Sequence, residues 1–101
     1  MIELSAGPAG VTRVSVTGEI DMDSSDELAA ALRDAAERAG TRTVVVDFAG
    51  VTFCDSSGIR VLDEAYALTA RRRIALQLVR VQPQVRRVLE IVGMTALLTH
   101  A

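Results

Sequence analysis

The chain of 101 residues carries 11 Lys and Arg against 13 Asp and Glu, and 50% of its residues are hydrophobic, which is the composition and length of one globular domain. A net charge of −2 and 3% aromatic residues argue against a nucleic-acid partner, because the chain has neither excess positive charge nor surfaces for base stacking. No apolar run reaches the roughly 20 residues of a membrane-spanning helix, and an export signal is lacking. We therefore expect one cytoplasmic domain over residues 1–101 with no membrane partner.

The single cysteine and the single histidine restrict the chemistry further. Cys54 has no second cysteine with which to form an internal disulfide, and His100 is the only imidazole available to a catalytic triad. Together they cannot supply the ligand set of a zinc site, and no acidic cluster has the spacing of a calcium loop. We expect no metal, no cofactor and no enzymatic activity.

The first half of the chain predicts a strand pair and a helix. Ile2 to Ser5 is a short strand, the Gly and Pro residues of 7–10 form a turn, and the β-branched run from Val11 to Thr17 is a second strand closed by Gly18. The S-x-x-E spacing of Ser24 and Glu27 predicts a capping box, in which each side chain bonds the other's backbone amide at the start of a helix. The apolar face of this helix comprises Leu28, Leu32, Ala35 and Ala39, and Gly40 follows as its end.

The second half of the chain begins with a buried strand. Val44 to Val46 is a continuous apolar run that leads into Asp47 and Phe48, which is typical of a central strand covered on both faces. After a connection over residues 49–54, a helix opens at Asp55 and ends near the arginines of 71–73. Its predicted apolar side comprises Ile59, Leu62, Tyr66 and Thr69, opposite Arg60, Asp63 and Glu64.

The remaining residues predict a strand over Ile74 to Val79 and a third helix that starts at Pro83 and ends at Gly93. The apolar face of that helix comprises Val85, Val88, Leu89 and Val92, and the tail from Met94 fits a short final strand. Strands that alternate with helices predict the α/β class: a mixed sheet of about four to five strands, with an antiparallel hairpin at its start and parallel pairs inside, covered by three to four helices.

The best candidate site is the start of the second helix. Asp55, Ser56, Ser57 and Gly58 follow the central strand, at the sheet edge where open α/β folds engage ligands and partners. An Asp or Ser there is also typical of any helix N-cap. Gly58 in the first turn costs about 1 kcal/mol relative to Ala, which indicates that the backbone comes close to something. Since Asp55 can cap the helix, at least one serine is left for another role.

These residues resemble a known family. The stretch from Val44 to Ile59, with its D-S-S-G sequence, resembles the signature of bacterial anti-sigma factor antagonists, which are single STAS domains. Gly18-Glu19-Ile20-Asp21 is similar to the family's G-E-[IL]-D motif, and the segment from Pro83 to Leu89 is similar to its third-helix motif. The resemblance implies a STAS-like sheet and a protein that, when unphosphorylated, binds an anti-sigma factor and releases a sigma factor.

The same resemblance implies the partners and the site residues. The anti-sigma factor would be an ATP-dependent serine kinase that phosphorylates this chain, and a phosphoprotein phosphatase would reverse the reaction. The family's phosphorylated serine corresponds to Ser56, with Ser57 as the second choice. The surface that binds the partner would comprise Gly18, Glu19, Asp21, Asp55, Ser56, Ser57, Gly58 and Arg60.

Other interpretations remain open at this stage. One is a STAS subunit that stays bound in a larger signalling or transport assembly without turnover at Ser56. A serine hydrolase of the G-x-S-x-G type is disfavoured, because Cys54 occupies the position of the first glycine. Cys54 itself suits a small packing residue better than a redox sensor. We expect a monomer, with a dimer as the alternative.

Overall fold

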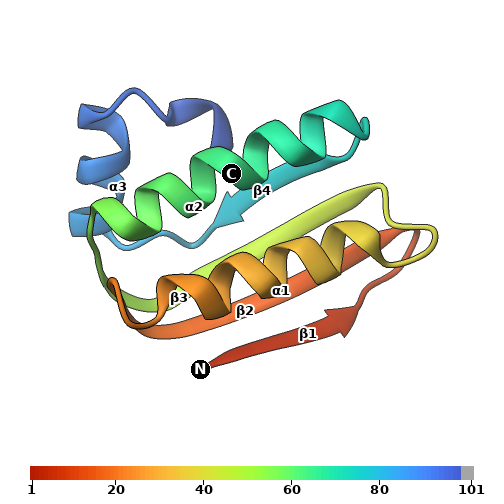
Figure 1. Cartoon of the computed structure of the whole chain (residues 1–101), viewed down its shortest axis with the longest axis horizontal. Helices are drawn as coiled ribbons and strands as arrows, with labels where there is room; N and C mark the ends of the chain where they lie inside the picture. Colours follow the sequence, from red (N-terminus) through yellow and green to blue (C-terminus); the bar gives the residue numbers. More distant parts are fainter. Residues whose placement is uncertain (99–101) are drawn as a thin grey trace.

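The structure, a computed structural model, describes residues 1–98. Its elements in chain order are β1 (Ile2–Ala6), β2 (Val11–Ile20), α1 (Ser25–Glu37), β3 (Thr43–Cys54), α2 (Ser56–Arg71), β4 (Ala75–Val79), α3 (Pro83–Ile91) and a short 3-10 helix η1 (Thr95–Leu97). In Figure 1, α1 and α2 lie side by side across one face of the sheet, and α3 lies beyond the end of β4. None of the helices described is long and apolar enough to cross a membrane.

Within residues 1–98, four strands form one mixed sheet in the order β1-β2-β3-β4. β1 pairs antiparallel with β2, whereas β2 with β3 and β3 with β4 pair in parallel, which confirms the predicted sheet. Both crossovers move the chain the same way across the sheet, and right-handed crossovers then place their helices on the same face. One face of the sheet is therefore covered by α1 and α2, and the other is left open by them.

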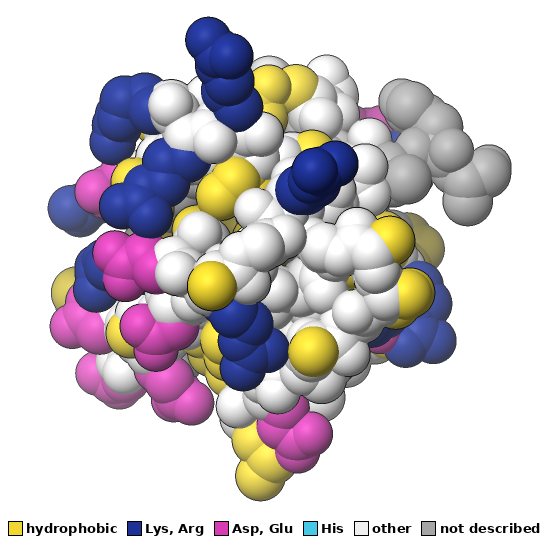
Figure 2. All heavy atoms as spheres, turned by 90° about the vertical axis from the view of Figure 1, so that its right-hand side faces the viewer, with side chains coloured by type: hydrophobic (Ala, Val, Ile, Leu, Met, Phe, Trp, Pro, Cys, Tyr) yellow, Lys and Arg dark blue, Asp and Glu magenta, His cyan; other side chains and the backbone are white. Residues whose placement is uncertain are grey.

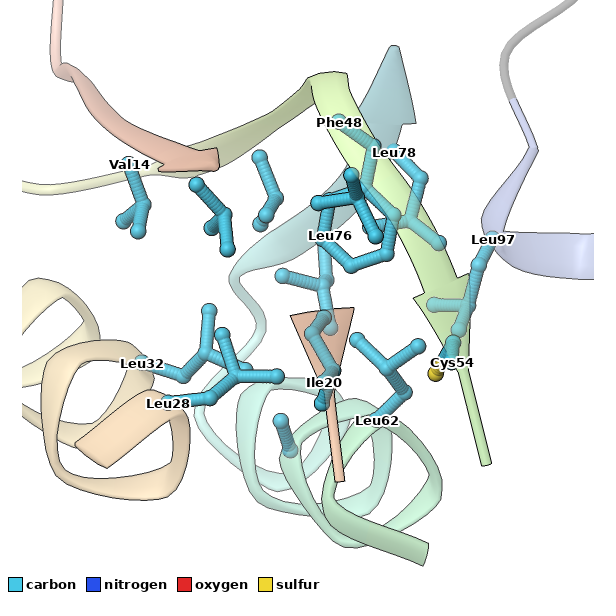
Figure 3. Packing of buried hydrophobic residues seen from close by; sticks show 14 of the residues in the cluster. Val14, Ile20, Leu28, Leu32, Phe48, Cys54, Leu62, Leu76, Leu78 and Leu97 are labelled. Atoms are coloured by element: carbon cyan, nitrogen blue, oxygen red, sulfur yellow. The ribbon is translucent and has the colours of Figure 1, made fainter. Parts of the chain in front are cut away.

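The core lies between the covered face and the two helices. Alternate residues of the strands point into it and meet leucines of α1 and α2, as Figure 3 shows. Val44 and Val46 of β3 are fully buried, but Val45 between them faces the open side and is only half-buried. The central position of β3 is thus confirmed, and the expectation that it is covered on both faces is wrong.

β2 and β3 extend further than predicted. Gly18 does not close β2, and residues 49–54 are strand rather than a connection, because the two strands stay paired as far as Ile20 and Cys54. The pairing shifts register between Ser15 and Thr17 and again between Gly18 and Glu19, and at both shifts the extra residue lies in β3. Gly18 has a φ of +100°, which a residue without a Cβ adopts readily. Beyond these shifts, β2 and β3 stay paired as far as the edge of the sheet where α2 begins.

The start and end of α1 differ from the prediction. The capping box is wrong, because the Ser24 hydroxyl donates to the carbonyl oxygen of Glu19 at 3.0 Å and makes no side-chain cap. The helix ends at Glu37, before the predicted Gly40, and Ala39 is exposed rather than part of the apolar face.

The later elements need smaller corrections. In α2 the side chain of Tyr66 is 41% exposed and Ala65 takes the inward position, and Val92 lies outside α3 with half of its surface exposed. The predicted final strand is a 3-10 helix followed by one bridge between Leu98 and Leu78. His100 lies outside the described residues.

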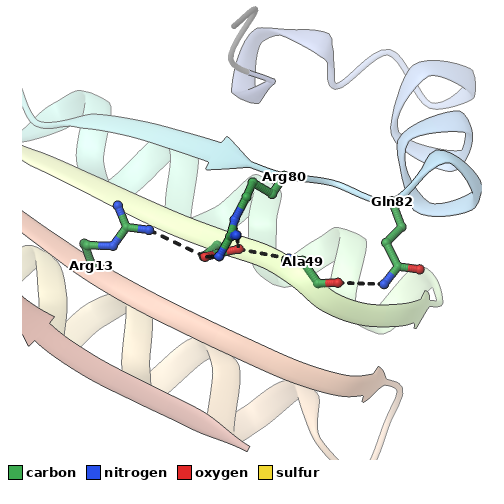
Figure 4. Close-up of polar contacts among 5 residues, drawn as sticks. Arg13, Ala49, Arg80 and Gln82 are labelled. Carbon is green, nitrogen blue, oxygen red and sulfur yellow. Dashed lines mark hydrogen bonds and ion pairs between the residues drawn. The ribbon is translucent and has the colours of Figure 1, made fainter.

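A buried carboxylate links the strands on the open face. Asp47 of β3 forms ion pairs with Arg80, which follows β4, and with Arg13 of β2 at 3.5 Å, and it accepts the Ala49 amide at 2.9 Å (Figure 4). Hydrogen bonding to Arg80 is the largest cause that lowers the pKa of Asp47, against the opposing effect of burial. The cluster therefore joins β2, β3 and the end of β4.

Beyond β4, side chains take over the role of a neighbouring strand. β4 pairs with β3 only as far as Asp47. The Gln82 side-chain amide donates to the carbonyl oxygen of Ala49 at 2.7 Å, and that of Gln84 donates to the carbonyl oxygen of Thr52 at 3.4 Å. The start of α3 is thereby tied to the outer half of β3.

We predict that Asp47→Asn lowers the free energy of unfolding at neutral pH by about 1–3 kcal/mol, because two arginines lose a charged partner. A carboxyl whose folded pKa is lowered stabilises the protein above its unfolded pKa, about 3.9, and this stability is lost as the pH falls through the folded value. Urea unfolding at several pH values should show the wild type approaching Asp47→Asn on acidification. The exposed Asp63→Asn is the control, and a difference that does not vary with pH would contradict the interpretation.

Candidate functional site

The candidate site is the junction of β3 and α2. Asp55 has an extended backbone (φ −92°, ψ −171°) and is the N-cap of α2, as predicted. Its Oδ1 accepts the amide of Ser57 at 2.8 Å and that of Gly58 at 3.4 Å, which satisfies two of the free amides at the helix start. The Asp55 side chain therefore caps the helix without help from either serine.

The same helix start is fixed to the ends of β2 and β3. The Asp55 amide donates to the carbonyl oxygen of Ile20 at 3.0 Å. Gly58 is buried, and a Cβ on it would lie 2.5 Å from Cys54 Sγ and 2.6 Å from Ile20 Cγ2. The close approach that the sequence indicates at Gly58 is thus an approach to the chain's own core. Gly58 lets the first turn of α2 pack directly on Cys54 and Ile20.

The two serines differ in their surroundings. Ser56 is exposed at the first position of α2, and its hydroxyl makes no hydrogen bond to any other residue within 1–98. Ser57 is half-buried, and its amide is held by Asp55. A second protein can therefore reach the Ser56 hydroxyl without displacing a contact of the fold.

Cys54 is buried beneath this junction. Burial, followed by the negative charge of Asp55, raises the pKa of the Cys54 thiol to about 11. The thiol stays protonated at neutral pH, and the thiolate is the reactive form. The geometry agrees with a packing role for this residue and speaks against a redox sensor.

The structure brings the other predicted residues to the same edge. Glu19 lies opposite Phe53 in the β2–β3 pairing, and Gly18 and Glu19 are exposed. The Asp21 side chain also has a structural role, because its Oδ1 accepts hydrogen bonds from the amides of Asp23 and Ser24 in the turn after β2. Arg60 is exposed one helical turn after Ser56, on the same side of α2.

Sequence reasoning missed one apolar residue at this edge and left another undecided. Phe53 is 47% exposed, and Met22, in the loop after β2, is 77% exposed. Met22 could be assigned equally well to a partner contact or to the lead-in of the helix. The sequence predicts a connection over residues 49–54, but the structure has strand there, and its alternation turns Cys54 inward and Phe53 outward.

Comparison with known proteins establishes the family. A family model described as "Mlab, STAS domain" matches residues 6–99, so the chain belongs to the STAS-domain family. No curated protein sequence matches the chain.

Solved structures show the same fold. An anti-sigma factor antagonist from Mycobacterium paratuberculosis has a TM-score of 0.84 at 26% identity, over 94% of this chain and 79% of that chain. SpoIIAA of Bacillus matches over 100% of this chain in both of its forms. The unphosphorylated form has a TM-score of 0.77 at 22% identity, over 88% of that chain. The phosphorylated form has a TM-score of 0.72 at 20% identity, over 91% of that chain. The mouse anion transporter Slc26a9 matches over 90% of this chain but only 15% of its own length, with a TM-score of 0.78 at 20% identity.

We predict that Gly58→Ala destabilises the fold by about 1–3 kcal/mol, because the added methyl group overlaps Cys54 and Ile20 in a packed core. Helix propensity alone predicts the opposite sign, a gain of about 1 kcal/mol. Thermal or urea unfolding distinguishes the two, with Ser57→Ala as a neighbouring control. A Gly58→Ala protein as stable as the wild type would show that the contact is not tight.

We predict that Asp55→Ala lowers the free energy of unfolding by about 1 kcal/mol through loss of the cap. Ser56→Ala should remain within about 0.5 kcal/mol of the wild type, because its hydroxyl has no structural partner among the described residues. The comparison uses urea unfolding of both variants. Equal losses for the two variants would contradict the division of roles between Asp55 and Ser56.

Proposed function

We propose that this protein is an anti-sigma factor antagonist whose binding is switched by phosphorylation of Ser56. The unphosphorylated chain binds an anti-sigma factor that is also an ATP-dependent serine kinase, and a sigma factor is thereby released. Phosphorylation separates the two proteins, and a phosphatase restores binding. The observation that carries the proposal is an exposed serine hydroxyl at a helix start that Asp55 already caps.

A phosphate on Ser56 is compatible with the fold. The free amides and the dipole of a helix N-terminus favour a nearby anion by about 0.3–1 kcal/mol. Arg60, one turn along the same side, adds a positive charge within reach of the phosphate in the free protein. The modification therefore acts on binding and leaves the domain folded.

The effect on binding is electrostatic. A phosphoserine adds about −1.5 to −2 charges next to Asp55 and on the same edge as Glu19, and burial of these charges against a surface fitted to a hydroxyl costs desolvation and repulsion. A change from almost wholly bound to almost wholly free takes about 5.5 kcal/mol. A screened surface ion pair is too weak for that, so Ser56 must lie inside the interface.

The apolar side chains at the edge support a protein partner. Met22, in the loop after β2, and Phe53, opposite Glu19 near the end of β2, are both exposed and can supply the hydrophobic part of an interface with the polar serine. In this proposal the chain is the substrate of the kinase rather than a catalyst. Among the solved relatives, SpoIIAA is named an anti-sigma factor antagonist with phosphorylated and unphosphorylated forms, which agrees with the proposal.

A second function is a STAS subunit that remains bound in a transport or signalling assembly. The observations in its favour are the family model, which is described by the name Mlab, and the match to a domain of the anion transporter Slc26a9. In that function Ser56 would contact its partner without turnover.

We predict that the purified chain, mixed with its cognate kinase and ATP, acquires one phosphate on Ser56, as mapped by mass spectrometry. Ser56→Ala should abolish labelling and keep binding, and Ser57→Ala should keep both. Ser56→Asp should fold normally and bind the kinase at least about tenfold more weakly, a difference of about 1.4 kcal/mol.

Two results would count against this function. Phosphate on a residue other than Ser56 defeats the assignment of the site, and equal affinity of Ser56→Ala and Ser56→Asp removes the electrostatic mechanism. A chain that no kinase labels, but that purifies in a fixed complex, supports the second function.

A further inference from the structure

Helix α2 carries more apolar surface than the core uses. Its buried positions are Gly58, Leu62, Ala65 and Thr69. Val61 and Leu68 lie beside this stripe and are only half-buried, although both are large apolar residues. The spacing of Val61, Ala65 and Leu68 places them on one line along the helix, turned toward α1.

These residues form the wall of a groove between α1 and α2. The groove has a volume of about 360 Å³, and α1 contributes Ala29, Leu32 and Arg33 to it. Small side chains at Ala29 and Ala65 leave the space open, because nothing larger fills the gap between the two helices. The floor of the groove is apolar.

The rim of the groove is mainly basic. Arg33 and Arg71 stand at the rim and form no ion pair with any other described residue, against one carboxylate, Glu64. Arg72, which follows Arg71 in the chain, forms an ion pair with Glu37 at 3.7 Å. Figure 2 views the molecule from the end where α1 and α2 finish, and both arginine and acidic side chains surround exposed apolar ones there.

We propose that this groove binds an acidic amphipathic helix of a partner protein. The lining residues of α2 run from Val61 to Arg71, about 15 Å or three helical turns, which matches the contact length of a docked helix and exceeds what a small anion needs. Leucines on one face of the partner helix fill the floor, and its carboxylates meet Arg33 and Arg71. The surface lies along the flank of α2, so it is separate from the Ser56 edge and available for a second partner.

The test uses a fluorescein-labelled peptide of about four helical turns, with leucines at i, i+3, i+4 and i+7 on one face and glutamates on the other. Fluorescence anisotropy measures its binding to the full chain. We expect saturable binding that the double variant Arg33→Glu/Arg71→Glu weakens at least tenfold, about 1.4 kcal/mol per tenfold. The double variant Arg42→Glu/Arg87→Glu is the matched control, with the same total change of charge at two exposed sites that do not line the groove, and should change the affinity by less than about twofold.

The chemistry of the occupant is tested with two further probes. The same peptide with lysine in place of glutamate should not bind, and titration of the acidic peptide should shift the amide signals of Ala29 to Arg33 and Val61 to Arg71 in NMR spectra. The proposal is overturned if the acidic peptide fails to bind, or if the Arg33→Glu/Arg71→Glu variant binds it as the wild type does. It is also overturned if laurate, a fatty acid, shifts those amides and the peptide does not.

Discussion

The arrangement of this domain depends on how closely the first turn of α2 approaches the ends of β2 and β3. Only a residue without a side chain fits at Gly58, because Cys54 and Ile20 occupy the space where a Cβ would be. The hydrogen bond from the Asp55 amide to Ile20 fixes the same turn from the other side. Together these contacts set the position of Ser56 on the surface.

Polar contacts on the open face support this junction from a distance. Asp47 and its two arginines hold β2, β3 and the segment after β4 in register. The side chains of Gln82 and Gln84 then donate to carbonyl oxygens in the outer half of β3, where β4 no longer pairs with it. β3, which ends immediately before Asp55, is therefore bonded on this side by β4 as far as Asp47 and by the two glutamines at Ala49 and Thr52. Ser56 follows this well-supported strand, which suits recognition by another protein.

Local sequence patterns were sufficient for much of the fold. Hydrophobic periodicity predicted the order of strands and helices, and the D-S-S-G sequence predicted the Asp55 cap. The errors arose where long-range pairing overrode local preference. Gly18 is typical of a strand end, but pairing with β3 continues past it as far as Ile20. Ser24 was expected to cap α1, but its hydroxyl is used by Glu19.

Other features had no local signal at all. Nothing in the sequence around Gln82 indicates that its side chain replaces a strand, because its partner Ala49 is 33 residues away. In the same way, Gly58 showed that the backbone approaches something, but its neighbour Ile20 became known only from the fold.

The central claim is that the Asp55 cap and the packing of Gly58 hold the first turn of α2 without the Ser56 hydroxyl, so that a charge on Ser56 alters the surface and leaves the fold unchanged. Amide hydrogen exchange of Ser57 and Gly58, compared between the unmodified chain and the chain phosphorylated on Ser56, tests this most directly. The account predicts protection factors within about threefold of each other, less than 1 kcal/mol. Protection that is lost from both amides on phosphorylation would show that the switch unfolds the helix start, and would contradict the account.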